Sequence, residues 1–463
     1  MKNKISTDTL CWIGFSLYLV LALWWSPERI FNTDNSNYFF HLINFKKFHF
    51  PENRYGVWLS QVPLLTAIQL KLSFPVLVYI YSLSFPILYL LIAIICRYYL
   101  QVKEAGLAIL LSMVCGVSFS FFHCVTETHQ CIVYAIGFYA AVVSQRSISW
   151  IIRIPLSIFF IIQSLLCHPN AAFILLGLVL VMFINKQITW KFVTGIAILI
   201  ALFIGYKLTS ATGYDQQQYN NLWQFFDTIT ILHRSYYFYF LSVHSIDTYL
   251  SFLLILVSTA IYCTRQKMLL QFLAIAFFSI CFTIITILTF YQGDADSMME
   301  KSLMPALLPF FVFISRHVFY NEKVVFIRGM LLLVIMLCSF VAIGKASKIH
   351  SNRLALLESI LEKNKYYPKL YIEQDSVKNT PLFTYQWATT IDAIWISKMN
   401  GKQASTLYLK HADEGEQKYS CDTSILYVPW WPDFTYFYMN QDYVEFPEIA
   451  YKNAELPEKK LAD

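Results

Sequence analysis

Charged side chains are scarce in this chain of 463 residues. Asp, Glu, Lys and Arg make up 14% of the sequence and hydrophobic residues 57%, whereas a soluble domain has about 25% charged residues. The composition therefore excludes an ordinary soluble protein. Internal repeats and low-complexity tracts are also missing. No small-residue cleavage site follows the first apolar stretch, residues 11–25, so we expect this stretch to be a retained anchor rather than a removed signal peptide.

Ionisable residues are almost absent from the apolar segments themselves. A proton- or ion-coupled transporter is expected to carry acids or bases near the middle of the membrane. In this chain the polar groups instead gather at the ends of segments that are expected to face outward. This distribution predicts a site at the outer interface, open to water on one side and to lipid on the other.

Apolar segments of the length that a bilayer requires, roughly 18 residues or more, recur between residues 10 and 344. Residues 54–72 are also apolar, but counting them as a span would place Arg97 and Lys103 outside, against the charge rule. With residues 35–48, they are expected to form interfacial helices in an outer loop, residues 27–74. We predict a polytopic α-helical membrane protein with about 11 transmembrane helices, at residues 10–26, 75–97, 105–122, 131–145, 150–167, 170–185, 189–207, 246–263, 267–291, 302–319 and 324–344.

Basic residues set the predicted orientation. With the N-terminus inside, the inner loops are rich in Lys and Arg and contain few acids (Asp8, Glu104 and Glu322). Insertion favours basic residues on the cytoplasmic side, so the acid-rich loops are expected to face outward. An odd number of spans then places the C-terminal region outside. The inner-loop Lys and Arg account for the net charge of +6, and no nucleic-acid partner is needed to explain it.

The composition changes after residue 345, which predicts two domains, residues 1–345 in the membrane and residues 346–463 outside it. Residues 352–363 place leucines on one helical face. Three short alternating runs, KLYIE, TLYLK and SILYV, predict strands, and a helix is expected at residues 383–399, between the first two. The order predicts a small extracytoplasmic α/β domain.

Three segments resemble those of a known superfamily. They are TDNSNYF in the first outer loop, ENRYGVWLSQVPLL in the surface helix, and EKSLMPALLPFF before the tenth span. With their order and the anchor helix before them, residues 1–345 resemble the GT-C membrane glycosyltransferases, such as the bacterial relatives of protein O-mannosyltransferases and the aminoarabinose transferases. The chain departs from that pattern at Asn35, where many members have a second acid. It departs again at residues 52–54, which replace a His-Pro-Pro or Lys-Pro element.

The resemblance implies an inverting transfer of a sugar from a polyprenyl phosphate. The lipid phosphate is a good leaving group, so one carboxylate is enough to take a proton from the acceptor hydroxyl. Asp34 is the candidate base, and its alternative role is to cap the helix expected after it. Glu127, in FFHCVTETHQC, is the second catalytic candidate, because it could face Asp34 and bind the acceptor. Its alternative role is that of a solvated loop acid.

Cations are needed where negative charge builds on the phosphate. The candidates are Lys301, Arg54, Arg234 and His233, because Arg offers bidentate contacts to phosphate and Lys a point charge. Alternatively, such residues extend along helix ends to lipid headgroups.

The sequence leaves the cofactor unknown. A divalent metal is possible, with Asp34, Glu127 and His129 as potential ligands and His123 as a fourth. Cys124 and Cys131 flank the same loop and would either form a disulfide in an oxidising compartment or remain two thiols.

These features predict an integral membrane glycosyltransferase that acts on a glycan, lipid or protein acceptor at the outer face. Its partners would be a polyprenyl-phosphate-linked sugar, the acceptor and membrane lipids. Outward-facing N-x-Ser/Thr sites are missing, which favours a bacterial inner membrane with the C-terminal domain in the periplasm. Two alternatives stay open: a non-catalytic transporter or binding subunit for lipid-linked glycans, and a polymerase or ligase of surface glycans.

Overall fold

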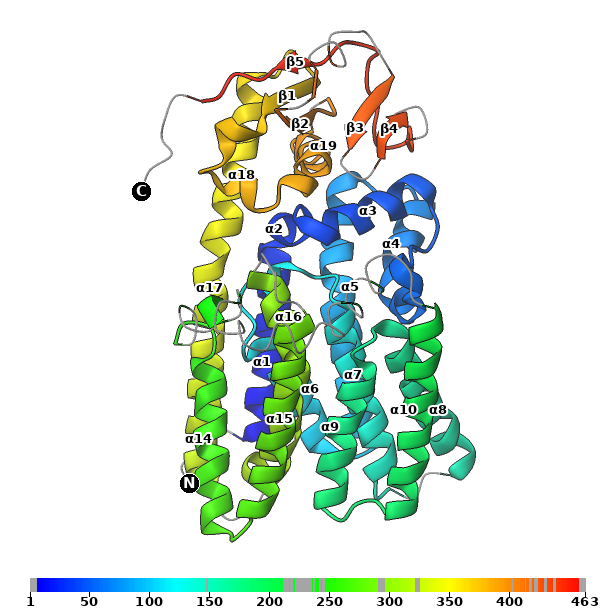
Figure 1. Ribbon diagram of the computed structural model, residues 1–463, viewed down its shortest axis with the longest axis vertical. Helices are drawn as coiled ribbons and strands as arrows, with labels where there is room; N and C mark the ends of the chain where they lie inside the picture. Colours follow the sequence, from blue (N-terminus) through cyan, green and yellow to red (C-terminus); the bar gives the residue numbers. More distant parts are fainter. Residues whose placement is uncertain are drawn as a thin grey trace.

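The computed structural model describes most of the chain. Long helices stand side by side in the lower part of Figure 1, and a smaller unit that contains strands covers their upper end. The described residues are 6–146, 149–210, 216, 220, 235, 238–240, 243, 246–289, 296–320, 325–401, 403–412, 414–415, 419, 424–428, 431–435 and 439–457.

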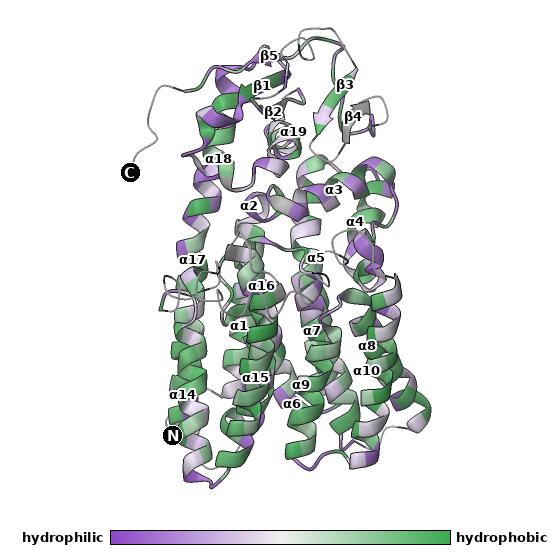
Figure 2. Cartoon of the chain, viewed as in Figure 1, coloured by the Kyte–Doolittle hydropathy of each residue, from purple (hydrophilic) through white to green (hydrophobic). Residues whose placement is uncertain are grey.

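The chain is a helical membrane protein. Within the described residues, seven helices are long and apolar enough to cross a membrane (α1, α5, α8, α10, α15, α16 and α17), and α9 and α14 are shorter apolar helices. Figure 2 shows that hydrophobic residues dominate the bundle. Each segment that was expected to span the membrane contains a helix: α1 (Thr7–Trp24), α5 (Phe74–Ile94), α6 (Lys103–Val114), α7 (Glu127–Val143), α8 (Trp150–Cys167), α9 (Ala171–Ile184), α10 (Trp190–Ser210), α14 (Leu250–Arg265), α15 (Leu269–Thr289), α16 (Asp296–Ile314) and α17 (Val325–Lys363).

The third of these segments is helical only in its first part. α6 ends at Val114, and the chain then forms a loop, residues 115–126, with one 3₁₀ turn, η4 (Ser120–Phe122). Gly116 has a φ of +68°, a left-handed conformation that glycine adopts without steric cost. The prediction of a helix through residue 122 is therefore wrong, and the loop that replaces its end becomes part of the candidate site.

Between α1 and α5 the chain stays at the upper end of the bundle (Figure 1). α4 has 12 residues and is therefore roughly 18 Å long, too short for a hydrocarbon core of about 30 Å. This length agrees with leaving residues 54–72 out of the spans. Gly56 lets the chain approach α8, because a Cβ there would lie 2.5 Å from the carbonyl oxygen of Gln163. The elements are α2 (Ser26–Ile30), α3 (Thr33–Phe45), η1 (Pro51–Asn53), η2 (Tyr55–Val57) and α4 (Trp58–Gln69).

α17 passes from the bundle into the upper unit as a single helix. Its 39 residues extend roughly 58 Å at about 1.5 Å per residue. The boundary predicted after residue 345 therefore falls inside a helix, and the second half of α17 forms a rigid connection to the upper unit. We call residues 364–457 the tail domain.

The tail domain contains both strands and helices. The three alternating runs form β1 (Lys369–Glu373), β2 (Thr406–Lys410) and β3 (Ile425–Val428). β1 is central and pairs in parallel with β2 and with β5 (Lys452–Asn453), while β3 forms an antiparallel pair with β4 (Trp431–Thr435). The helix expected at residues 383–399 is divided into α18 (Pro381–Thr384), a 3₁₀ turn, and α19 (Thr389–Met399), which packs on β2.

The tail domain is docked directly on α3. Trp395 of α19 is fully buried, and its ring lies 5.5 Å from the ring of Phe39 and 5.4 Å from that of Phe74. Near the other end of α3, the backbone N–H of Asn440 donates to the side-chain oxygen of Asn44 at 2.7 Å. The tail domain therefore fixes the position of the helix that begins beside Asp34.

A buried ion pair joins α17 to α19 beside the start of α3. Arg353 lies 2.6 Å from Asp392, with side-chain exposures of 2% and 0%, and Arg353 also donates to the backbone oxygen of Phe31. Burial raises the pKa of Asp392, and Arg353 opposes that shift. Removing one member of such a pair leaves the other charge buried without compensation, so each single substitution should destabilise the fold.

We expect Asp392→Asn to lower the melting temperature of the purified protein by several degrees, since breaking a buried pair costs about 3–5 kcal/mol. Replacing both members, Arg353→Met with Asp392→Leu, should cost less than either single change, because no charge is then stranded. Differential scanning fluorimetry in detergent measures this. Asp247→Asn, which removes an exposed pair with Lys345, is the control and should have little effect. A double variant less stable than both single variants would contradict this account.

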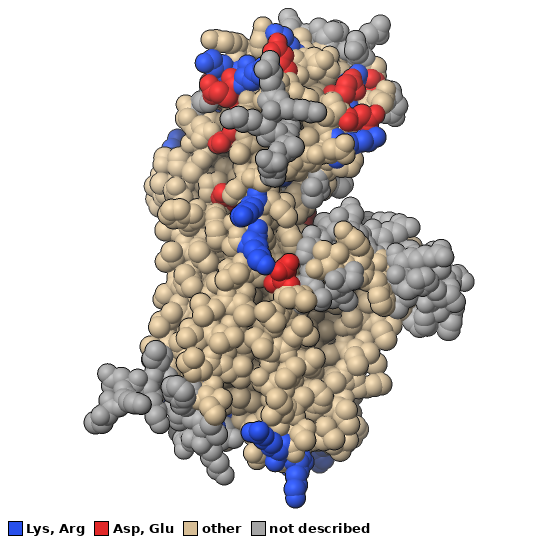
Figure 3. Space-filling model, turned by 90° about the vertical axis from the view of Figure 1, so that its left-hand side faces the viewer, with Lys and Arg blue, Asp and Glu red and all other residues tan. Residues whose placement is uncertain are grey.

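The opposite end of the bundle is basic. On the face shown in Figure 3, Lys and Arg gather at the lower end, a broad area above them is free of charge, and both signs occur from mid-height to the upper end. Two described acids at the lower end are paired, Glu104 with Arg316 at 2.8 Å and Asp8 with Arg97. This distribution is the one that the charge rule predicts for a cytoplasmic face.

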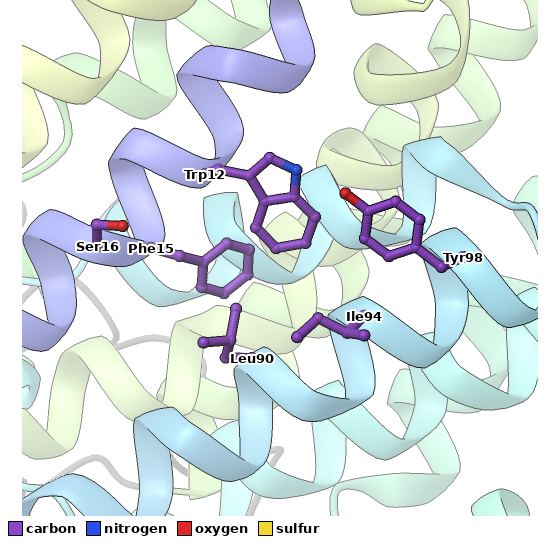
Figure 4. Close-up of a pocket in the computed structure, with 6 residues that line it drawn as sticks. All are labelled: Trp12, Phe15, Ser16, Leu90, Ile94 and Tyr98. Carbon is purple, nitrogen blue, oxygen red and sulfur yellow. The ribbon is translucent and has the colours of Figure 1, made fainter.

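A shallow hollow lies on the surface of the bundle between α1 and α5. It has a volume of about 300 Å³ and is lined by Trp12, Phe15, Ser16, Leu90, Ile94 and Tyr98. Figure 4 shows the rings of Trp12 and Phe15 facing Leu90 and Ile94 of α5. The ring of Trp12 stacks on that of Tyr98, with the centroids 5.8 Å apart. Trp and Tyr are enriched at membrane–water interfaces.

Candidate active site

Asp34 lies in the first turn of α3. The N-cap of this helix is Asn32, so the alternative interpretation of Asp34 as the cap is wrong. A carboxylate in the first turn is favoured by the free N–H groups and the dipole of the helix. Asp34 is partly buried, and burial raises its pKa, against the effect of Lys301. An acid in this setting binds protons more tightly than an exposed aspartate does.

Asn35 holds the first turn of α3 against the loop of residues 115–126. Its side-chain nitrogen donates to the backbone oxygens of Arg29 at 2.7 Å and Phe122 at 2.9 Å, and its side-chain oxygen accepts from the N–H of Val125 at 2.9 Å. The residue is fully buried. A carboxylate could not donate these two bonds, so Asn35 has a structural role here.

We expect Asn35→Asp to destabilise the protein, because two buried carbonyl groups lose their donor at about 1–3 kcal/mol each. The melting temperature should fall by several degrees, and Asn35→Ala should behave similarly. Asn453→Asp, at an exposed position of β5, is the matched control. If Asn35→Asp unfolds at the wild-type temperature and shows increased activity, position 35 tolerates a second acid and the structural role is wrong.

Glu127 is the first residue of α7 and lies between a phenol and a guanidinium. The hydroxyl of Tyr38, on α3, donates to its carboxylate. Arg54, which precedes η2, lies 3.4 Å from the same oxygen, with side-chain exposures of 11% for Arg54 and 13% for Glu127. Glu127 is therefore a largely buried acid in an ion pair, and its interpretation as a solvated loop acid is wrong.

Lys301 enters the site from α16. Its amine lies 3.0 Å from Nδ1 of His123, at the end of η4. Burial and the charge of Lys301 hold the pKa of His123 well below its usual range, so His123 is neutral and can accept a hydrogen bond from the lysine. Only 7% of Lys301 is exposed.

The neighbour of Lys301, Glu300, anchors this part of α16. Its carboxylate accepts from the backbone N–H groups of Ser118 (3.0 Å), Phe119 (3.1 Å) and Ser120 (2.6 Å), and from both serine hydroxyls. Successive N–H groups of this kind form an anion-binding concavity. The loop of residues 115–126 is thereby fixed to α16, which places His123 beside Lys301.

Four ionisable groups from four parts of the chain lie within range of one another's charges at the tail-domain end of the bundle. Asp34 lies close enough to Lys301, Glu127 and Arg54 for their charges to act on its carboxyl group. Lys301 and Arg54 lower the pKa of Asp34 and Glu127 raises it, while burial raises it most. We call these four residues the acid–cation cluster. Its two acids and two cations lie at the end of the apolar helices that is nearer to the tail domain.

Two further residues belong to this region and were not predicted as site residues. Tyr38 binds Glu127 as described above. His168, after α8, accepts from the N–H of Asn170 at 3.0 Å and lies within electrostatic range of Arg54 and Glu127. Burial and Arg54 lower its pKa to about 3. His168 is therefore a neutral polar group at the edge of the cluster.

Two of the predicted phosphate-binding residues, His233 and Arg234, lie outside the described residues. Cys124 and Cys131 are separate free thiols, and the sulfur of Cys131 contacts the hydroxyl of Ser164 at 3.2 Å, so the disulfide alternative is wrong.

The possible metal ligands do not form a group within the described residues. In the part of the chain that the structure describes, no three His, Cys, Asp or Glu side chains form a group that could hold an ion. Asp34, Glu127 and His129 are not brought together as a ligand set, and His123 contacts Lys301 instead. The positive charge of the cluster is provided by Lys301 and Arg54.

No protein-family model, curated protein sequence or solved structure matches this chain. The acid–cation cluster and its place at the end of the bundle are therefore the basis for any functional proposal.

Proposed function

We propose that this chain is an integral membrane glycosyltransferase. It transfers a sugar from a polyprenyl phosphate to a glycan, lipid or protein acceptor at the face of the membrane where the tail domain lies. The observation that carries the proposal is the acid–cation cluster. Buried ionisable residues at membrane level are costly and mark functional sites, and this cluster combines a candidate base with two cations.

The proposed reaction needs a base and phosphate-binding groups. Asp34 takes the proton of the acceptor hydroxyl while the acceptor oxygen forms a bond to the anomeric carbon. The bond between that carbon and the phosphate oxygen breaks, and its electron pair leaves with the polyprenyl phosphate. Attack from the face opposite the leaving group inverts the anomeric configuration. Lys301 and Arg54 stabilise the charge that develops on the phosphate.

Glu127 has a supporting role in this scheme. Its ion pair with Arg54 and its hydrogen bond from Tyr38 hold a cation and a phenol at the start of α3. Its negative charge also raises the pKa of Asp34, which makes Asp34 a stronger base once it is ionised. Glu127 can in addition accept a hydrogen bond from an acceptor hydroxyl.

We also propose the orientation and compartment. About 11 spans with the N-terminus inside, the basic end of the bundle in the cytoplasm, and the tail domain outside would suit a bacterial inner membrane with the tail domain in the periplasm. The polyprenyl-phosphate donor would then be reached from the periplasmic leaflet.

An assay in proteoliposomes tests the proposal against a transporter. The vesicles contain purified protein and a polyprenyl-phosphate sugar labelled in both lipid and sugar, and a panel of acceptors is added. A glycosyltransferase releases free polyprenyl phosphate and labels one acceptor. If the labelled donor instead crosses the bilayer intact, the protein moves its ligand without breaking the glycosidic bond, and the proposal is wrong.

A further inference from the structure

A small, partly open cavity lies beside His123, the partner of Lys301. Its volume is about 10 Å³. It is formed where α1, α2, α5, α6 and α7 meet the loop of residues 115–126. The residues that matter for its chemistry are Arg29, Tyr89, His123 and His129. A space of about 10–15 Å³ is enough for one water molecule when two to four polar groups surround it.

Arg29 provides a buried positive charge at this cavity. It is 1% exposed, and its hydrogen bonds go to neutral acceptors, the hydroxyl of Ser82 at 3.0 Å, the backbone oxygen of Phe121 at 2.7 Å and that of Ser82 at 3.4 Å. Its guanidinium carbon lies 4.4 Å from the ring centre of Phe121. No carboxylate among the described residues forms an ion pair with Arg29. A buried cation of this kind gains from every additional acceptor.

Two other groups at the cavity have no hydrogen-bond partner within the described residues. They are Nε2 of His129 and the hydroxyl of Tyr89, both buried. Leaving a buried polar group unsatisfied costs about 1–3 kcal/mol. The two groups belong to different helices, α7 and α5, and both residues line the same cavity as Arg29.

We propose that this cavity is a binding site for a single ordered water molecule. The water accepts from Arg29 and exchanges hydrogen bonds with Nε2 of His129 and the hydroxyl of Tyr89. It thereby connects α2, α5 and α7 under the loop that places His123 beside Lys301. The proposal does not depend on the activity of the protein, since it follows from the cavity and the groups around it.

A pair of tyrosines on one helix tests the proposal. Tyr81 and Tyr89 are both on α5, both buried, and both have hydroxyls without a partner in the described part of the chain, but Tyr81 is not among the residues that line this cavity. If water bonds to Tyr89, Tyr89→Phe removes a satisfied hydrogen bond and lowers the melting temperature by about 1–2 °C. Tyr81→Phe removes an unsatisfied group and leaves the melting temperature unchanged or raises it. Equal shifts in the two variants would overturn the proposal.

Two further measurements support or exclude the same site. In a protein that already carries His129→Leu, Tyr89→Phe should lower the melting temperature by less than it does in the wild type, because the water has already lost one partner. Additive effects would contradict a shared water. A density map that resolves ordered water should show one isolated peak within hydrogen-bond distance of Arg29, His129 and Tyr89. If this position is empty in such a map, the cavity is dry and the proposal fails whatever the outcome with His129→Leu.

Discussion

Asp34→Asn is expected to reduce sugar transfer by about 10²–10⁴-fold, the usual contribution of a general base. Asparagine keeps the size of the side chain and its place in the first turn of α3, but it cannot take a proton from the acceptor. Asn35, which holds this turn to the loop of residues 115–126, is unchanged in the variant. The protein should therefore insert, fold and bind donor as the wild type does, and turnover of lipid-linked sugar by purified protein measures the loss.

The pH dependence gives a second readout for the same residue. A base must be deprotonated to act, so the transfer rate should rise with pH as Asp34 ionises. Because burial raises the pKa of Asp34, the midpoint of this rise should lie above the ordinary aspartate pKa of about 3.9. Glu127 raises that pKa and Lys301 lowers it. Glu127→Gln should therefore move the midpoint of the rise to lower pH. Lys301→Gln should move the midpoint measured on its residual activity to higher pH. If the midpoint is the same as in the wild type in both variants, another group titrates.

Asp442→Asn is the control for this prediction. Asp442 is a partly exposed acid of the tail domain that pairs with Lys46 at 3.1 Å, away from the acid–cation cluster. Its loss should leave transfer unchanged. If Asp442→Asn and Asp34→Asn reduce the rate equally, the effect of Asp34 comes from general surface charge and not from a base.

Removing either cation of the cluster should produce the second large effect. Charge-assisted hydrogen bonds are worth roughly 1.5–3 kcal/mol, so Lys301→Gln and Arg54→Gln should each slow transfer by about 10- to 150-fold. Glutamine keeps the polarity and much of the stem while the charge is lost. The effect should appear mainly in kcat if the contact strengthens as the phosphate leaves.

Lys345→Gln is the matched control for the cations. Lys345 is exposed on α17 and pairs with Asp247 at 2.6 Å, and its removal should leave kcat unchanged. Arg234→Gln extends the series to a residue outside the described part of the chain, where a role in phosphate binding stays a prediction. If neither Lys301→Gln nor Arg54→Gln changes turnover or donor binding, the phosphate is bound elsewhere.

The ends of apolar segments explain why much of the site could be predicted. A helix that must cross the membrane places its polar neighbours at the interface, so Asp34, Glu127 and Lys301 could be expected at one end of the bundle from segment lengths and charge alone. Which of them meet depends on the rotation of each helix, and this a hydropathy pattern does not give. The electrostatic influence of Lys301 on Asp34, 267 residues earlier in the chain, therefore required the structure.

The parts that could not be predicted depend on irregular backbone. Residues 115–122 are apolar enough to resemble the end of a span, but the conformation of Gly116 and the three N–H groups that bind Glu300 form a loop there. One signal was available, the acid beside Lys301 in EKSLMPALLPFF, because a buried glutamate needs donors nearby. The position of Tyr38 on α3, facing Glu127, depends on the tail domain that packs on this helix.

The release of free polyprenyl phosphate is the measurement that tests the central proposal most directly. Wild-type protein and Asp34→Asn, reconstituted in nanodiscs at equal concentration, are given a polyprenyl-phosphate sugar with an acceptor, and the lipid products are followed by mass spectrometry. We predict that the wild type releases polyprenyl phosphate only when acceptor is present, and that Asp34→Asn binds the donor but releases at least about 100-fold less. Equal release by the two proteins would contradict the assignment of Asp34 as the base, and no release by the wild type with any acceptor would contradict glycosyl transfer itself.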